Sequence, residues 1–235
     1  MENRIIEEIH KVLRLLANKL DGFYLAGGTA LSLFYFHHRE SYDLDFFTKD
    51  FSKVNIEKII SDLSVSIRSP IKLIGEQNGK DKAKMLVYEL EIGKEHSIKI
   101  DFVEDFYELI TPIQNINDIP VLSKEDIYIK KILTICGSLE TIDSLGRKHF
   151  AGGRQDVKDF FDLYFLSSTF MPLSKFASKH CSQTQIESII VWYHKYNREE
   201  IKLALNDIRT DKKVEFQEME RYFRLEVEQI VKQEL

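Results

Sequence analysis

Two aspartates, Asp43 and Asp45, are separated by a single residue and follow a glycine pair, Gly27 and Gly28, by a short apolar stretch. We expect the acids to lie on a strand over residues 43–47, where residues i and i+2 point to the same face. The two carboxylates would then project side by side, within reach of one metal ion. Two hard oxygen ligands suit Mg²⁺ held together with substrate phosphates. This arrangement predicts the chemistry of nucleotidyl transfer, in which metal ions bridge attacking and leaving oxygens.

The residues before the acids predict a loop that receives phosphate. Gly27 and Gly28 permit a close approach of the backbone to a ligand, and they precede a helix whose amides can accept phosphate oxygens. Thr29 could cap that helix and give its hydroxyl to a phosphate. Ser41, two residues before the first acid, could contact a triphosphate, and Arg39 could neutralise phosphate charge. The alternative is a plain strand–turn–helix with a glycine turn.

The segment Gly-Gly-Thr-Ala-Leu that begins at Gly27, followed by Arg39-x-Ser41-x-Asp43-Leu-Asp45-Phe-Phe, resembles the AbiEii/AbiGii toxin family. The coarser pattern, Gly-Gly followed by a helix and then Asp-x-Asp, resembles the nucleotidyltransferase superfamily that includes DNA polymerase beta. The resemblance implies the toxin half of a bacterial toxin–antitoxin or abortive phage-infection system, with a cognate antitoxin as partner. It further implies an NTP substrate, Mg²⁺ or Mn²⁺ as cofactor, and RNA as acceptor, at the 3′ end of tRNA.

Asp101 is the candidate for a third acid. Between Ile98 and Phe102 the apolar residues alternate with Lys99 and Asp101. Period-two alternation places the apolar side chains on one face of a strand and Asp101 on the other. By the resemblance, a third acid completes the metal site with Asp43 and Asp45 or activates the attacking hydroxyl. The alternative is a solvent-facing residue of an antiparallel sheet.

The segment Glu125-Asp126-Ile-Tyr-Ile-Lys130-Lys131 resembles the family's Glu-Glu-Ile…Lys element, with Lys131 at the lysine. The resemblance implies that Lys131 binds the triphosphate as a compact point charge. Lys130 lies about 100° away around a helix, so both lysines cannot face one cleft equally.

Residues 154–163 resemble the family's Arg-x-Lys/Arg-Asp-x-x-Asp-Leu element. On this alignment Asp156 is the functional acid, and Arg154 is a phosphate or base contact. Alternatively, Asp156 forms a buried salt bridge with Lys131 that fixes two helices.

The register of that element stays open, because Gln155 stands where the family has a basic residue before its first acid. We interpret Asp159 and Asp162 as structural residues.

The net charge of −5 argues against bulk attraction to nucleic acid. An RNA acceptor would need a local basic patch. Five residues could supply one, although each could equally be a solvated surface side chain: Lys130, Lys131, Arg147, Lys148 and Arg154.

Two cysteines, Cys136 and Cys181, lie far apart and show no metal-binding spacing, which indicates free thiols in a reducing compartment. No apolar run approaches the length that spans a membrane. We therefore expect a cytoplasmic protein without a membrane partner.

The pattern of apolar residues predicts an α+β fold, with a nucleotidyltransferase-like mixed sheet and flanking helices followed by a helical bundle. We place the α/β domain at 1–118 and the helical domain at 119–235, and we expect no strand beyond about residue 122. Residues 93–96 should join two strands as a hairpin. The predicted strands are 23–26, 43–47, 71–74, 84–92 and 97–103. The predicted helices are 2–20, 29–37, 52–63, 123–138, 154–168, 173–180, 183–194, 197–206 and 214–233.

Three functions remain open. The first is a nucleotidyltransferase toxin acting on RNA. The second is a nucleotidyltransferase acting on a small molecule of the antibiotic type or on a protein side chain. The third is a catalytically inactive NTP-binding protein on the same scaffold.

Overall fold

The computed structural model describes residues 2–80, 82–93 and 96–234, and the chain divides into two compact units. The sheet unit comprises residues 1–35 and 41–123, and the helical unit comprises residues 36–40 and 124–235. The chain therefore passes between the units three times. The short segment 36–40 leaves the sheet unit and returns to it directly before the acids. The fold class is α+β, as the sequence predicted.

The sheet unit is built on a seven-stranded mixed sheet with the order β3-β4-β5-β2-β1-β7-β6. Its strands are β1 (Phe23–Ala26), β2 (Leu44–Thr48), β3 (Ile71–Gln77), β4 (Met85–Ile92), β5 (His96–Glu104), β6 (Gln114–Ile116) and β7 (Ile119–Val121). β2 runs parallel to β5, and β1 runs parallel to β7, while the other neighbours are antiparallel. The centre of the sheet thus joins strands that lie far apart in the sequence.

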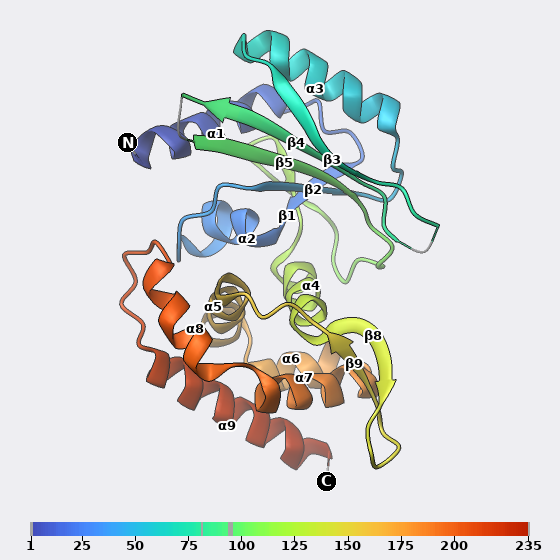
Figure 1. Cartoon of the computed structure of the whole chain (residues 1–235), viewed down its shortest axis with the longest axis vertical. Coiled ribbons are helices and arrows are strands. Elements are labelled where there is room, and N and C mark those ends of the chain that lie inside the picture. The colour runs from blue at the N-terminus through green and yellow to red at the C-terminus, as the bar shows by residue number, and fades with distance from the viewer. Residues whose placement is uncertain (1, 81, 94–95, 235) are drawn as a thin grey trace. The chain divides into compact units, whose positions relative to one another are not determined.

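One face of this sheet forms the hydrophobic core of the unit. In β5, Ile98, Ile100 and Phe102 are all fully buried. The helices α1 (Glu2–Leu16) and α3 (Lys53–Ile67) cover this face (Figure 1). A shorter helical segment, α2 (Gly27–Ala30) continued by a π-helix over Leu31–Phe36, connects β1 to the acid-bearing segment. Lys99 and Asp101, which alternate with these residues in β5, therefore lie on the opposite face of the sheet.

The five predicted strands of the sheet unit are all present, with ends shifted by up to three residues. The hairpin β6–β7 was not predicted. Its turn is Asn117-Asp118, with φ of 53° and 61° at the two positions. Two consecutive left-handed residues suit a two-residue hairpin, and Asn and Asp tolerate them. The predicted hairpin of β4 and β5 is present, with Ile92 paired to His96. Of its predicted loop 93–96, His96 already belongs to β5, and residues 94–95 lie outside the described residues.

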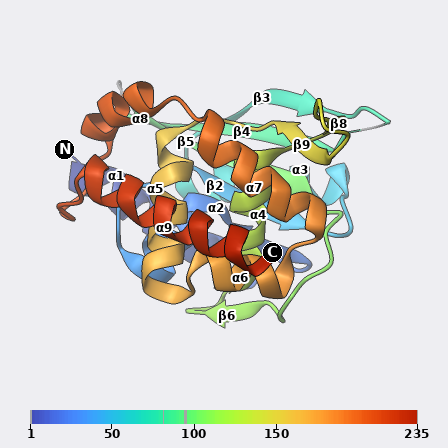
Figure 2. The same ribbon diagram turned by 90° about the horizontal axis from the view of Figure 1, so that it is seen from below.

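The helical unit contains α4 (Lys124–Cys136), α5 (Val157–Phe165) with a π-helix over Leu166–Phe170, α6 (Leu173–His180), α7 (Gln183–Lys195), α8 (Arg198–Ala204) with a 3₁₀ turn over Leu205–Asp207, and α9 (Phe216–Glu234). Helix α9 buries Met219, Phe223, Val227 and Ile230, spaced at helical intervals. It packs along α6 and α7 (Figure 2). None of the described helices combines the length and the hydrophobicity needed to cross a bilayer.

The prediction of no strand beyond about residue 122 is wrong. A two-stranded antiparallel sheet is formed by β8 (Gly137–Ile142) and β9 (Lys148–Gly152). Leu139 and Ile142 on this hairpin are 65% and 66% exposed. Because its apolar residues do not mark a buried face, the sequence pattern did not indicate a strand.

Candidate active site

Asp45 and Asp101 lie side by side on neighbouring strands. Asp45 is the register partner of Asp101 in the parallel pair β2–β5. Both side chains are half-buried, whereas Leu44 and Ile100, which precede them, are fully buried. Successive side chains alternate between the two faces of a sheet. The two carboxylates therefore share the face opposite the core.

Asp43 lies one residue before β2, which begins at Leu44 rather than at the predicted residue 43. Its side chain is exposed. Its charge nevertheless acts at the same place, because it helps to raise the pKa of Asp101.

Asp101 is an uncompensated acid. Burial, and then the negative charge of Asp43, raise its pKa to about 6, while Lys99 opposes the shift. Its Oδ1 is buried and has no hydrogen-bond partner among the described residues. A carboxylate in this state is stabilised by a proton or a cation placed against it.

Gly27 provides the room for Asp45. Its φ is +71°, in the left-handed region, and a Cβ at this position would collide with the Oδ2 atom of Asp45. A side chain here would therefore force the acid to move. At Gly27, the positive φ and the close approach of the Asp45 carboxylate both require a residue without a side chain.

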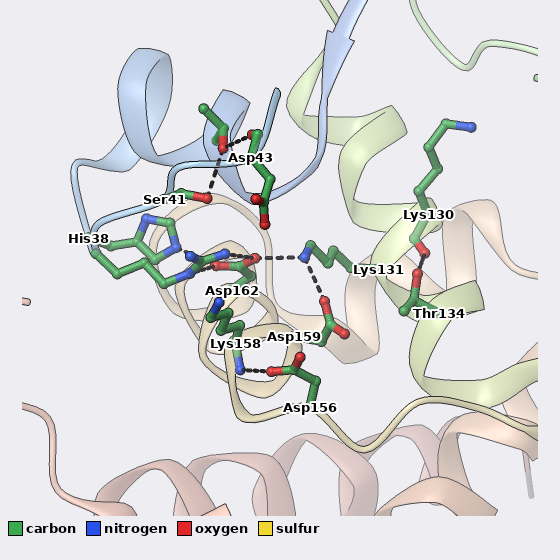
Figure 3. Close-up of polar contacts among 12 residues, drawn as sticks. His38, Ser41, Asp43, Lys130, Lys131, Thr134, Asp156, Lys158, Asp159 and Asp162 are labelled. Carbon is green, nitrogen blue, oxygen red and sulfur yellow. Dashed lines mark hydrogen bonds and ion pairs between the residues drawn. The ribbon is translucent and has the colours of Figure 1, made fainter. Parts of the chain in front are cut away.

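Thr29 holds the loop that carries Asp43. Its fully buried hydroxyl donates to the main-chain carbonyl of Asp43 and shares a hydrogen bond of 2.8 Å with the hydroxyl of Ser41 (Figure 3). The predicted capping role of Thr29 is wrong, because the N-cap of α2 is Ala26, which makes no side-chain cap. Thr29 instead joins the glycine loop to the acid loop.

The acids fit a hard divalent cation by their chemistry, and the unpartnered Oδ1 of Asp101 is a position that a cation would satisfy. No group of three or more His, Cys, Asp or Glu side chains in the described ranges is placed to hold a metal ion by itself. Mg²⁺ is usually held by one or two carboxylates, with phosphate oxygens and waters as the remaining ligands. A phosphate-bearing ligand would therefore complete the site.

Arg39 lies in the helical unit and is buried. Its guanidinium forms a fork on Asp162, with Nε to Oδ1 at 2.6 Å and Nη2 to Oδ2 at 2.9 Å. A third nitrogen, Nη1, donates to the carbonyl of Glu40 at 2.9 Å. Burial by itself would disfavour the charged form of both side chains. The negative charge of Asp162 offsets this effect and raises the pKa of Arg39.

Asp162 is the centre of a buried ionic network. Besides Arg39, it binds Nζ of Lys131 at 2.7 Å and Nε2 of His38 at 2.7 Å (Figure 3). Burial alone would raise the pKa of Asp162, but Lys131 and Arg39 hold it well below the usual range. Burial lowers the pKa of His38, although the contact with Asp162 opposes this shift.

Asp159 shares Lys131 with Asp162. It accepts from Lys131 at 2.7 Å and from Nε of Arg154 at 2.7 Å. The two carboxylates together keep the pKa of Lys131 above its ordinary value, although burial alone would lower it. The alternative of a salt bridge between Asp156 and Lys131 is therefore wrong, because Asp159 and Asp162 make that contact. Asp156 is the N-cap of α5 and accepts from the amide of Lys158 at 2.8 Å.

A second register of the family element is compatible with the structure. Lys158-Asp159-Phe-Phe-Asp162-Leu163 matches Lys/Arg-Asp-x-x-Asp-Leu, with its basic residue in place. Both acids in this register are fully buried and bind Lys131. Lys158 is the sequence signal for this second register, in which Asp156 stands where the element has its arginine.

The remaining basic residues are not gathered around this network. On the β8–β9 hairpin, Arg147 pairs with Asp143 and Lys148 pairs with Glu140. The side chain of Lys130 points away from Asp159 and Asp162 (Figure 3). Of the five predicted patch residues, Lys131 and Arg154 are the two that share a cluster.

Known structures of the same fold include JHP933 from Helicobacter pylori, at 17% identity and a TM-score of 0.58, with 96% of this chain and 93% of that chain covered. The nucleotidyltransferase toxin MenT4 from Mycobacterium tuberculosis H37Rv matches at 13% identity and a TM-score of 0.57, with 97% and 82% covered. No curated protein matches the chain.

The model of one protein family, described as nucleotidyl transferase AbiEii toxin of type IV toxin–antitoxin systems, matches residues 12–232. The match includes both acid-bearing strands, the glycine loop and the buried network. Enzymes that transfer nucleotides generally use divalent metal ions, which agrees with the donor chemistry of the acids. The chain belongs to the AbiEii family of nucleotidyltransferase toxins.

Proposed function

We propose that the protein transfers a nucleoside monophosphate from an NTP to a hydroxyl of an RNA acceptor, at the 3′ end of tRNA, in the bacterial cytoplasm. The acceptor oxygen bonds to the α-phosphorus, the bond from that phosphorus to the β-phosphate oxygen breaks, and pyrophosphate leaves. A cognate antitoxin would restrain the activity. The single observation that carries the proposal is the pairing of Asp45 with Asp101 beside Gly27.

Asp43, Asp45 and Asp101 would hold Mg²⁺ together with the phosphates of the NTP. Bound there, the cation would supply charge neutralisation for the transferred group. In the alternative arrangement, Asp43 and Asp45 hold the cation and Asp101 takes the proton of the acceptor hydroxyl, because in the absence of metal its pKa of about 6 lies closer to neutrality than that of an ordinary carboxylate.

Gly27 and Gly28 would supply backbone that a triphosphate can approach. Thr29 holds the acid loop in place through its hydrogen bonds to Ser41 and Asp43. Lys131 and Arg154 would place positive charge toward the phosphates. The ammonium of Lys131 has three N–H donors, of which two serve Asp159 and Asp162. Asp156 caps the first turn of α5.

The test is transfer of label from each of the four α-³²P-labelled NTPs, with Mg²⁺, onto total bacterial RNA and protein. Wild type is compared with Asp43→Ala, which removes an exposed carboxylate and no core packing. Label on RNA that disappears in the variant supports the proposal and identifies the nucleotide.

Other outcomes redirect it. Asp43-dependent label on protein would replace RNA by a protein acceptor. Label on neither, with NTP binding intact, would favour a small-molecule acceptor or a binding protein. Undiminished transfer by Asp43→Ala would contradict the assignment of the acids.

A further inference from the structure

The segment 36–40 is held by the helical unit although it interrupts the sheet unit in the sequence. Its main chain is fixed by two hydrogen bonds to the loop before α9. The amide of Glu40 donates to the carbonyl of Arg209 at 2.8 Å, and the hydroxyl of Thr210 donates to the carbonyl of His38 at 2.6 Å.

Two side chains of the segment, those of His38 and Arg39, are buried. His38 is fully buried, and its ring lies against Phe161 and Phe165 at centroid distances of 5.8 and 5.0 Å. The fork between Arg39 and Asp162 is buried on both sides, with the side chains 4% and 0% exposed. A buried, charge-assisted bidentate pair fixes orientation as well as distance.

The backbone leaves this anchor and reaches Asp43 within three residues. Glu40 is the last residue of the anchored segment. Ser41 follows it and is hydrogen-bonded to Thr29, and Asp43 comes two residues later. A chain of three residues spans at most about 10 Å, so it has little slack to absorb a shift of its starting point.

We propose that Arg39 and Asp162 are positioning residues, whose ion pair anchors residues 36–40 and thereby fixes the loop that presents Asp43. This inference rests on the proposed function for its kinetic readout, but not for its structural one. It gives Arg39 a role different from the phosphate contact that its place in the motif predicted. Three of its nitrogens already serve groups of the protein itself.

The experiment compares Arg39→Lys with the matched control Arg198→Lys. Lysine keeps the charge but loses the fork. Arg198 also binds an acid, Glu220, and a main-chain carbonyl, that of Tyr193, within the helical unit. Steady-state kinetics of label transfer, NTP affinity, thermal unfolding and hydrogen exchange of the amides of residues 41–45 are measured for both.

For Arg39→Lys we expect kcat to fall about 100-fold, as for a catalytic group displaced by about 1 Å, with the KM for NTP changed less than threefold. The amides of residues 41–45 should exchange at least tenfold faster than in the control. A raised KM for NTP with unchanged kcat would make Arg39 a phosphate contact and overturn the proposal. Unchanged exchange would overturn it as well.

Two features keep the outcomes separable. If neither wild type nor variant transfers label, the proposed function fails, while the exchange rates still decide the anchoring. If Arg39→Lys does not fold, Thr210→Val removes one hydrogen bond of the same anchor, and faster exchange at residues 41–45 is again required.

Discussion

The acids of the sheet unit and the acids of the helical unit are opposite in their electrostatics. Asp101 is half-buried, lies near a like charge and has an oxygen without a partner. Asp162 is fully buried and is contacted by Arg39, Lys131 and His38. The charged form of Asp101 is therefore destabilised, whereas the charged form of Asp162 is stabilised.

This difference indicates a division of labour. A destabilised carboxylate attracts whatever cation or proton the reaction brings, and such groups cluster at active sites. A saturated carboxylate has nothing left to offer a ligand and instead fixes the segments that bind it. Substitution of each acid in turn tests this difference.

The largest effect is expected from Asp101→Asn. Loss of the acid should lower the transfer rate by about 10²–10⁴, the range for removing a general base. The fold should be as stable as wild type or more so, because repulsion from Asp43 is removed. Single-turnover transfer and thermal melting check both. A variant that unfolds would place Asp101 with the structural acids.

Asp162→Asn, unlike Asp101→Asn, should destabilise the fold in addition to lowering the transfer rate. Removing one partner from a buried ionic network costs about 3–5 kcal/mol, because cations are left without a counter-charge. Urea unfolding of the whole chain measures this loss. Asp143→Asn is the matched control, since Asp143 also pairs with an arginine but on the exposed hairpin, where we expect little change.

The two acids should also differ in the pH dependence of stability. Because the folded pKa of Asp101 is raised, the native state holds more protons than the unfolded state between about pH 4 and 6. Its contribution to stability therefore falls as pH rises through that window. The free energy of unfolding of Asp101→Asn, relative to metal-free wild type, should increase from pH 4 to 7 and then level off.

For Asp162 the sign is opposite. Its folded pKa is lowered, so its contribution is present above the ordinary carboxylate range and is lost as pH falls below it. A single trend shared by the two acids would contradict the contrast.

The smallest effect is expected at His37, which lies within the anchored segment 36–40 and has a φ of +48°. His37→Gly relieves a left-handed position at some cost in chain entropy, so we expect a stability change within about 1 kcal/mol. His37→Val places a β-branched side chain there and should be destabilising by about 1–3 kcal/mol. Paired thermal melts distinguish them. Equal stability of the two variants would show that the turn is not strained.

Much of the fold followed from periodicity, which reports a buried face. The strand β5 was predictable because its isoleucines alternate with Lys99 and Asp101. The hairpin β8–β9 was not, because Leu139 and Ile142 are exposed. The hairpin β6–β7 has strands of three residues each, too short for alternation to be distinguished from loop composition.

The site was predictable in its residues more than in their partners. Asp43, Asp45 and Gly27 were identified by type and spacing, and their roles stay predictions. The partner of Lys131 was not, because helical spacing makes Asp159 a neighbour of both Asp156 and Asp162 and does not show which of the three acids meets the lysine. Only tertiary packing selects Asp159 and Asp162. The burial of Arg39 was equally hidden, since a motif shows which residues are present and not which unit of the fold holds them.

The anchor of the acid loop has a consequence for synthesis of the chain. Arg39 and Asp162 are separated by 123 residues. At about 5–20 residues per second, a ribosome needs about 6 to 25 s to extend the chain from the first to the second. During that interval Arg39 has no counter-charge and the loop has no anchor. The loop that carries Asp43 can therefore reach its anchored form only after α5, which carries Asp162, has been synthesised.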